Sequence, residues 1–207
     1  MKSDTLKNID KSLKKYKEEY KYTPLFKKAE NKIQIEDPKL VHEYDFKKIK
    51  SSIPNNDDYK IITIDGSYQE ELSNIPSEIS INKYSDLSED MKGEFQKAYQ
   101  GFDDSDNDVF SSINTINHLE CLTICVEKDV NIKNKVSIIN FINSTHSSYF
   151  RKSILIKKNS YASFSEEFVG HTKEISFSNS VTEIFLHENS KTDYFSCQNF
   201  GKNFHFN

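Results

Sequence analysis

The three cysteines are the side chains of this chain best suited to bind a metal ion or carry sulfur. Cys121 and Cys125 lie four residues apart in an apolar segment, and Cys197 is isolated from both. Structural zinc sites usually combine two closely spaced ligand pairs, and the sequence holds no second pair. Because residues four apart in a β-strand point to the same face, we expect Cys121 and Cys125 to be buried packing residues.

The acidic segment from Asp103 to Asp108 resembles the opening of a calcium-binding loop. A loop that began at Asp104 would need a glycine at its sixth position and a glutamate at its twelfth. The chain has Val109 and Thr115 at those two positions. We therefore expect a solvated loop that caps the helix after it.

Four histidines could serve as metal ligands or as bases, but their spacing argues against both roles. His146, His171, His187 and His205 form no HxxxH or HExxH pair, so we expect surface or packing residues. The chain also lacks the GxxxxGK[ST], GxSxG and GxGxxG motifs, and it has only five glycines. The sequence therefore predicts no catalytic, cofactor-binding or metal-binding residue and favours a protein that is not an enzyme.

Glu166 and Glu167 form the one carboxylate pair that raises an enzymatic alternative. A polysaccharide-cleaving enzyme built on a β-helix would need two carboxylates that face the same substrate. Neighbouring residues in a strand point to opposite faces, so these two side chains do not meet that requirement. This alternative is weaker than a binding or scaffold function.

The charge and hydropathy of the chain exclude several classes of partner. A net charge of −4 and a pI near 5.9 argue against an electrostatic surface for nucleic acid. No segment approaches the roughly 18 apolar residues of a membrane span, and the first residues do not resemble a signal peptide. An odd number of cysteines suits a reducing compartment, so we predict a cytoplasmic protein without a membrane partner.

The front of the chain shows mainly helical patterns. Apolar residues at three- and four-residue spacing predict a helix that stops before Pro24, and a second helix begins near Asp37-Pro38. An apolar run closed by Asp65-Gly66 predicts a strand and a turn. The expected elements after Pro38 are a helix that reaches Ile49, the strand Lys60–Asp65, and the helices Leu87–Tyr99 and Val109–Ile116.

A register that returns every 30 residues dominates the rear of the chain. Ile124, Ile154 and Ile184 each stand within a short apolar run that leads into a polar turn. A fixed period of this length is typical of solenoids, in which each unit buries its apolar face against the next. We expect strands at Leu119–Val126, Val136–Ile142, Ser153–Ile156, Ala162–Val169, Ile175–Phe177, Thr182–Leu186 and Asp193–Cys197.

Together these patterns predict an α+β fold. We expect a small, mainly helical N-terminal region with one or two short strands at residues 1–117, and a partial β-helix core at residues 118–207. The β-helix is expected to be truncated at its C-terminal end, which leaves an open edge that invites pairing with another chain or self-association. A self-associating β-solenoid fragment without catalytic activity is therefore an alternative reading of the function.

Several segments, taken in order, resemble the SufB/SufD family, whose members are scaffolds of the SUF iron–sulfur cluster assembly system. The segments Glu19–Leu25, Ile62–Tyr68 and Ser112–Thr115 resemble elements of the N-terminal part of SufD. The segments Phe168–Gly170, Phe177–Ile184, Glu188–Ser190 and Asn203–Phe206 are similar to strands of the SufB/SufD core. The N-terminal segments favour the SufD branch over SufB.

This resemblance implies a scaffold that acts through protein–protein contacts with a SufB-like scaffold and a SufC-like ATPase. It implies a β-helix core and no cofactor bound by this chain alone, with the iron–sulfur cluster as the product of the assembled complex. Family members are much longer, so the resemblance also implies that the C-terminal half is missing. No functional residue of the family is carried over to this chain.

Overall fold

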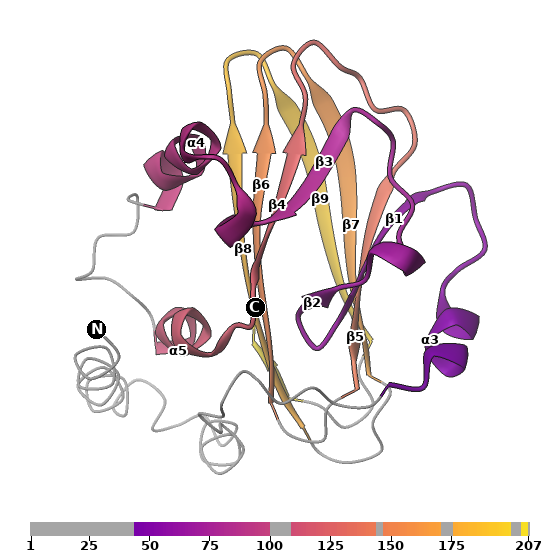
Figure 1. The fold of residues 1–207 in the computed structure, drawn as a ribbon. Coiled ribbons are helices and arrows are strands. Elements are labelled where there is room, and N and C mark those ends of the chain that lie inside the picture. Colours follow the sequence, from indigo (N-terminus) through magenta and orange to yellow (C-terminus); the bar gives the residue numbers. More distant parts are fainter. Residues whose placement is uncertain (1–43, 100–108, 144–146, 171–175, 200–203, 207) are drawn as a thin grey trace.

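The structure, a computed structural model, describes residues 44–99, 109–143, 147–170, 176–199 and 204–206. These residues form two five-stranded sheets that pack face to face, with their strands running along the long axis of the molecule (Figure 1). Sheet A has the strand order β2-β1-β5-β7-β9, and sheet B has the order β10-β8-β6-β4-β3. From β4 onward, successive strands alternate between the two sheets.

Within the described residues, three helices and two short 3-10 turns accompany the strands. The helices are α3 (Phe46–Ser52), α4 (Glu89–Tyr99) and α5 (Val109–Asn117), and the 3-10 turns are η2 (Glu70–Leu72) and η3 (Tyr84–Asp86). The strands are β1 (Tyr59–Ile64), β2 (Ser67–Tyr68), β3 (Ile79–Lys83), β4 (Cys121–Val126), β5 (Val136–Ile142), β6 (Ser147–Ile156), β7 (Tyr161–Gly170), β8 (Phe177–Leu186), β9 (Lys191–Asn199) and β10 (Phe204–Phe206).

The predicted 30-residue register is confirmed in the strand pairing. Ile124 on β4 is the partner of Ile154 on β6, which is the partner of Ile184 on β8. Tight turns end each of these three strands, and Asp129, Asn159 and Asn189 take positive φ angles of 60°, 59° and 56° there. Asn159 donates to Asp129 and Asn189 donates to Asn159, each across 30 residues of sequence, so the turns stack as the strands do.

The main apolar core lies between the two sheets. It consists of inward-facing side chains of both sheets, such as Ile61, Ile138, Phe164, Ile124 and Ile154. Alternation along β7 is clear, since Ala162, Phe164, Glu166 and Phe168 are buried and their neighbours are more exposed. Burying the isoleucine and phenylalanine faces supplies the main driving force for the packing of the two sheets.

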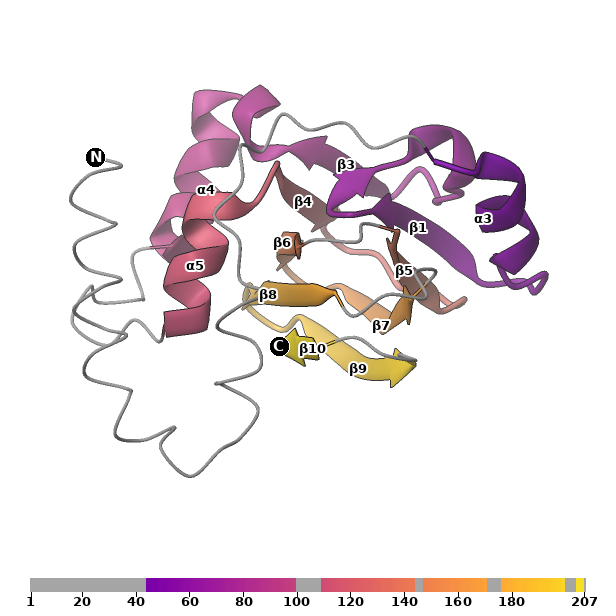
Figure 2. The same ribbon diagram turned by 90° about the horizontal axis from the view of Figure 1, so that it is seen from below.

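Helices cover part of the outer face of each sheet (Figure 2). On sheet A, Ile49 of α3 packs with Ile62, Ile64, Ile139 and Phe141. On sheet B, Phe95 of α4 packs with Leu87, Cys125 and Leu155, and α5 lies against β6 and β8. The outer faces of the sheets are therefore apolar beneath α3 and α4.

The predicted fold class is wrong. The protein is mostly sheet, with two mixed and mainly parallel sheets in an α/β-like arrangement, and not a helical region followed by a truncated β-helix. Strands from before residue 118 join both sheets: β1 lies parallel to β5, and β3 lies antiparallel to β4. The prediction missed β3 although Ile79 to Asn82 alternates apolar and polar residues, because that pattern is only four residues long. It missed the joining of both strands to the later ones because long-range pairing leaves no local signal.

Most of the individual elements match their predictions. The structure contains the strand and turn near Lys60–Asp65, the helices near Leu87–Tyr99 and Val109–Ile116, and strands at or near all the segments expected after residue 118. Ile175–Phe177 and Thr182–Leu186 belong in part to one strand, β8. The helix before Pro24 and the start at Asp37-Pro38 lie outside the described residues, and α3 begins only at Phe46 with Asp45 as its N-cap.

No helix within the described part of the chain is both long and apolar enough to cross a membrane. The division of the chain at residue 117 stays a prediction.

Candidate functional site

A buried ion pair joins the two sheets in the interior. Lys152 on β6 and Glu166 on β7 are each 1% exposed, and Lys152 Nζ lies 2.5 Å from Glu166 Oε1. The Glu166 carboxylate also accepts hydrogen bonds from Asn140 Nδ2 at 2.7 Å and from the Tyr194 hydroxyl. Thr63 donates to Asn140 Oδ1 at 2.7 Å and extends the row across sheet A to β1. We call these five residues the interior polar cluster.

Further groups compensate the charge of the Lys152 ammonium. Lys152 Nζ donates to Ser180 Oγ at 3.3 Å and lies 5.8 Å and 5.5 Å from the ring centroids of Phe150 and Phe168. A cation over an aromatic face is favoured, and more so where water is excluded. The ammonium therefore has a carboxylate, a hydroxyl and two rings around it, which is what a buried charge needs to be tolerated.

Two titratable side chains of edge strands, Tyr194 and His205, extend into the same interior and have shifted pKa values. Burial, followed by the charge of Glu166, raises the pKa of Tyr194 on β9. Burial lowers the pKa of His205 on β10 to about 4, and nearby Lys152 acts in the same direction while Glu166 opposes it. His205 packs against the Phe168 ring with the ring centroids 4.2 Å apart, and its Nδ1 lies 2.8 Å from Ser178 Oγ.

The interior polar cluster is arranged to hold the two sheets together. Its ammonium, carboxylate, amide and hydroxyls are directed at one another, and the Glu166 oxygens carry three donors from three different strands. A network whose members satisfy each other fixes one arrangement of the strands. We therefore assign the interior polar cluster a structural role.

A second polar group lies on the outer face of sheet B beneath α5. Arg151 pairs with Glu183 at 3.3 Å and donates to Thr115 Oγ1 at 3.0 Å. Ser153 donates to the same Glu183 carboxylate at 3.2 Å, and Cys121 Sγ lies 3.8 Å from Ser153 Oγ. This group connects α5 to β6 and β8.

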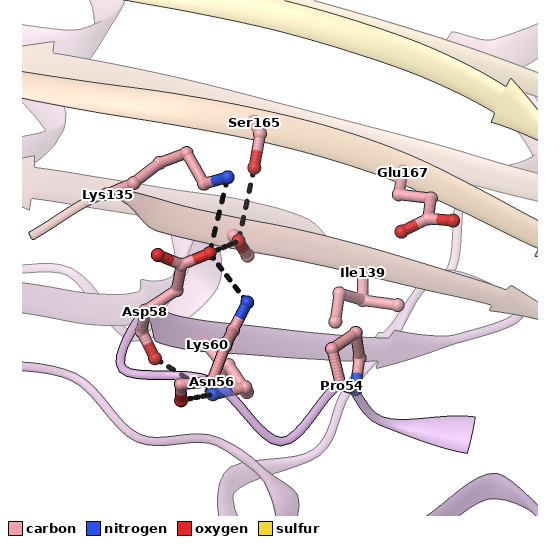
Figure 3. Close-up of a pocket in the computed structure, with 9 residues that line it drawn as sticks. Pro54, Asn56, Asp58, Lys60, Lys135, Ile139, Ser165 and Glu167 are labelled. Carbon is pink, nitrogen blue, oxygen red and sulfur yellow. Dashed lines mark hydrogen bonds and ion pairs between the residues drawn. The ribbon is translucent and has the colours of Figure 1, made fainter.

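A hollow of about 120 Å³ opens on the outer face of sheet A beside α3 (Figure 3). Its floor comes from β1, β5 and β7, and the segment before β1 forms its rim. The lining residues are Pro54, Asn56, Asp58, Lys60, Lys135, Ser137, Ile139, Ser165 and Glu167. Asp58 Oδ2 is the centre of one wall, where it accepts from Asn56 Nδ2 at 3.0 Å and Ser137 Oγ at 3.1 Å and pairs with Lys135 at 3.3 Å.

The structure places most of the chemically interesting side chains apart from one another. Cys121 and Cys125 are buried as predicted, and burial raises the pKa of Cys125 to about 11, whereas Cys197 is exposed on β9. His187 is exposed in a turn and His205 packs in the interior, as expected for surface and packing histidines. His146, His171 and the acidic segment from Asp103 to Asp108 lie outside the described residues.

Glu166 and Glu167 point to opposite faces of β7, as their strand positions predicted. Glu166 lies in the interior with Lys152, and Glu167 lines the outer hollow (Figure 3). The two carboxylates therefore cannot act together on one sugar substrate. Among the described residues, no three His, Cys, Asp or Glu side chains lie together in a way that could hold a metal ion.

Sequence reasoning missed Lys152 and Tyr194 as partners of Glu166. A lysine between Phe150 and Ile154 in a strand that otherwise faces the core was a signal, because charged residues are rarely buried without a partner. The identity of that partner depends on the pairing of strands from different sheets and is not visible in the sequence.

Comparisons with known proteins do not place the chain in a family. Neither a scan against protein-family models nor a search of curated proteins found a match.

Proposed function

We propose that this chain is a SufD-like scaffold subunit of iron–sulfur cluster assembly in the cytoplasm. It acts through protein–protein contacts with a SufB-like scaffold and a SufC-like ATPase, and not as an enzyme. The cluster is the product of the assembled complex, and this chain alone binds no cofactor. The order of the seven segments that resemble the SufB/SufD family supports the assignment of these partners.

The observation that carries the scaffold mechanism is the outer edge of β9. This nine-residue strand pairs with β7 on one side and with no other described strand on its other side. Natural edge strands are usually blunted by lysine, proline or a bulge. Within Lys191–Asn199 there is one lysine, at the first position, and no proline, so the backbone donors and acceptors of β9 can accept another strand.

The edge of sheet B lies at the same end of the molecule (Figure 2). β10 pairs only with Phe177–Asn179, so the rest of β8 has no described partner on that side. Two apolar side chains are well exposed at this end, Phe195 at 64% and Leu186 at 52%. A partner with the same alternating strands would extend both sheets and cover these side chains together.

Co-expression tests this proposal. The tagged chain is produced together with the SufB-like and SufC-like proteins of the same source, and the purified material is identified by mass spectrometry. We expect the SufB-like protein to co-purify, alone or with the ATPase attached. Phe195→Lys, which puts a charge on the edge strand, should abolish this recovery.

Leu119→Lys is the matched control. Leu119 is also an exposed apolar residue, at 43%, but it precedes β4 and is distant in sequence from both open edges. This variant should recover the partner as the unchanged chain does. Recovery of no partner by a folded chain would overturn the proposal, and so would recovery that is insensitive to Phe195→Lys. Light scattering on the chain alone then decides whether the edge pairs with a second copy instead.

A further inference from the structure

We propose that the hollow on the outer face of sheet A binds a short alkylammonium group, with the Glu167 carboxylate as its counter-ion. This inference does not depend on the proposed scaffold function, because it rests on the side chains that line the hollow and not on the backbone of the open edge, although Phe195 lies near both. It follows from how the hydrogen-bonding groups around the hollow are used.

The donors of the hollow are engaged with its own acceptors. Lys60 Nζ donates to the carbonyl oxygens of Asn56 and Asp58, at 2.9 Å each. Asn56 Nδ2, Ser137 Oγ and Lys135 Nζ are all directed at the Asp58 carboxylate. Figure 3 shows this connected wall on one side of the hollow. The lysines keep further N–H groups, but an anion that reached them would lie near the Asp58 and Glu167 carboxylates that line the same hollow.

Two acceptors remain directed at the hollow. Glu167 is half-buried on the opposite side, and among the described residues its carboxylate has no hydrogen-bond or ion-pair partner (Figure 3). Ser165 Oγ lies 3.1 Å from Ser137 Oγ. Because Ser137 gives its proton to Asp58, Ser165 must be the donor in that contact, and its oxygen keeps lone pairs for a further donor.

A ligand that matches these acceptors carries only hydrogen-bond donors at one end. A primary ammonium has three N–H donors and a positive charge, so it can bond to Glu167 and Ser165 and keep one contact with water. Ile139 and Pro54 line the same hollow and offer an apolar surface to a short alkyl stem.

The neighbouring edge strand adds an aromatic surface. Phe195 on β9 is the register partner of Ser165 on β7, and it is 64% exposed. Partners on adjacent parallel strands point to the same face of a sheet, so Phe195 stands on the outer face beside the hollow. An exposed ring beside Ser165 further favours a cation over a neutral or anionic ligand.

The charges of the hollow are balanced before a ligand binds, because its lining contains two lysines, Lys60 and Lys135, and two carboxylates, Asp58 and Glu167. Long-range attraction is therefore weak, and we expect binding in the millimolar range that depends on direct contact with Glu167. The ammonium could belong to a free small amine or to a lysine side chain of another protein, and the two sources share the same head and stem.

NMR titration of the full chain tests the proposal with n-butylammonium chloride and with the peptide acetyl-Ala-Lys-Ala-amide. The backbone amides of Ser137, Ile139, Ser165 and Glu167 should shift and saturate. Glu167→Gln, which keeps the shape and removes the charge, should weaken binding at least about tenfold, as loss of a charge-assisted hydrogen bond does. Glu71→Gln, at an exposed glutamate elsewhere, should bind like the unchanged chain.

Neutral n-butanol provides a test that needs no variant. It has the same stem and should cause no saturable shift at these four amides. If n-butanol shifts them as n-butylammonium does, or if Glu167→Gln binds n-butylammonium as well as the unchanged chain, the proposal is wrong. Tighter binding of the peptide than of the amine would identify a lysine side chain as the ligand, and the reverse result would identify a free amine.

Discussion

At the scale of single residues, Gly66 and the interior ion pair constrain the fold most strongly. Gly66 ends the β1–β2 turn with a φ of 89°, a conformation that side chains with a Cβ rarely adopt. The Asp65 carboxylate, just before it, accepts hydrogen bonds from the backbone N–H of Asn143 at 2.9 Å and from Ser148 Oγ at 2.7 Å. The turn therefore connects β1 to the start of β6 as well as to β2.

Gly66→Ala should destabilise the protein by at least about 2 kcal/mol, measured by urea unfolding. The added Cβ would stand 2.3 Å from the backbone oxygen of Tyr149, in addition to the backbone strain. Gly93→Ala is the control, because nothing lies within 4 Å of its added Cβ in α4. That change should be neutral or stabilise by about 0.5–1 kcal/mol, as in an ordinary helix. Equal effects of the two substitutions would contradict this account.

Lys152→Met should destabilise the protein by about 3–5 kcal/mol, because it leaves the Glu166 carboxylate buried without its counter-ion. Adding Glu166→Gln to this variant removes the uncompensated charge, so the double variant should be more stable than Lys152→Met alone. Urea unfolding of the three proteins measures both effects. If the second substitution adds a further loss of similar size, the pair does not interact as the structure indicates.

At the scale of elements, the stacked turns and the short strand β10 are the features whose stability depends most clearly on single side chains. Asn159 has a positive φ, and its side-chain amide donates to Asp129 in the preceding turn. The same side chain accepts a hydrogen bond from Asn189 in the following turn. Asparagine suits this position because it tolerates a left-handed backbone and can donate and accept at once.

Asn159→Ala should therefore cost more stability than Asn159→Gly. Both substitutions remove the side-chain amide, but only alanine adds strain at a φ of 59°. We expect a difference of about 1–2 kcal/mol in the free energy of unfolding, measured by chemical denaturation. An alanine variant as stable as the glycine variant would show that the turn adopts another backbone conformation.

Attachment of β10 should weaken as the pH falls from about 6.5 to about 4. The pKa of His205 is lowered to about 4 in the fold from an ordinary value of 6.5. Detached β10 therefore binds an extra proton in this window, and stability rises with pH across it. Protection of the amides of residues 204–206 against hydrogen exchange should fall by about tenfold per pH unit on acidification.

His205→Gln is the control for this pH dependence. Glutamine does not titrate, so protection in that variant should be insensitive to pH over the same window after correction for intrinsic exchange. If the unchanged chain shows the same flat profile, His205 is not the group that couples protonation to β10.

At the scale of the whole molecule, the packing of two sheets over a shared core makes the fold one cooperative unit. Ile154 is fully buried there, between its register partners Ile124 and Ile184. Ile154→Ala should cost about 2–5 kcal/mol, whereas Phe195→Ala on the outer face should change the stability by less than about 0.5 kcal/mol. Unfolding followed by circular dichroism and by tyrosine fluorescence should coincide in both variants. Separate transitions would mean that the sheets unfold independently.

Much of the local structure was determined by the sequence alone. The periodic isoleucines and the polar turns after them defined the strands and their 30-residue register, because side-chain burial and turn chemistry act over a few residues. The burial of Cys121 and Cys125 and the opposite orientations of Glu166 and Glu167 followed from the same strand geometry. The Asp65-Gly66 turn was also visible, because aspartate and glycine both tolerate the positive φ angles of a tight turn.

Only the tertiary structure decided how these strands combine. The addition of β1 and β3 to the two sheets, the pairing of Lys152 with Glu166 and Tyr194, and the hollow around Glu167 all join residues that are distant in the chain. A local pattern records which side of a strand is apolar but not which other strand will cover it. That choice depends on the free energy of the whole packed arrangement, which is why the predicted fold class was wrong while most of its elements were correct.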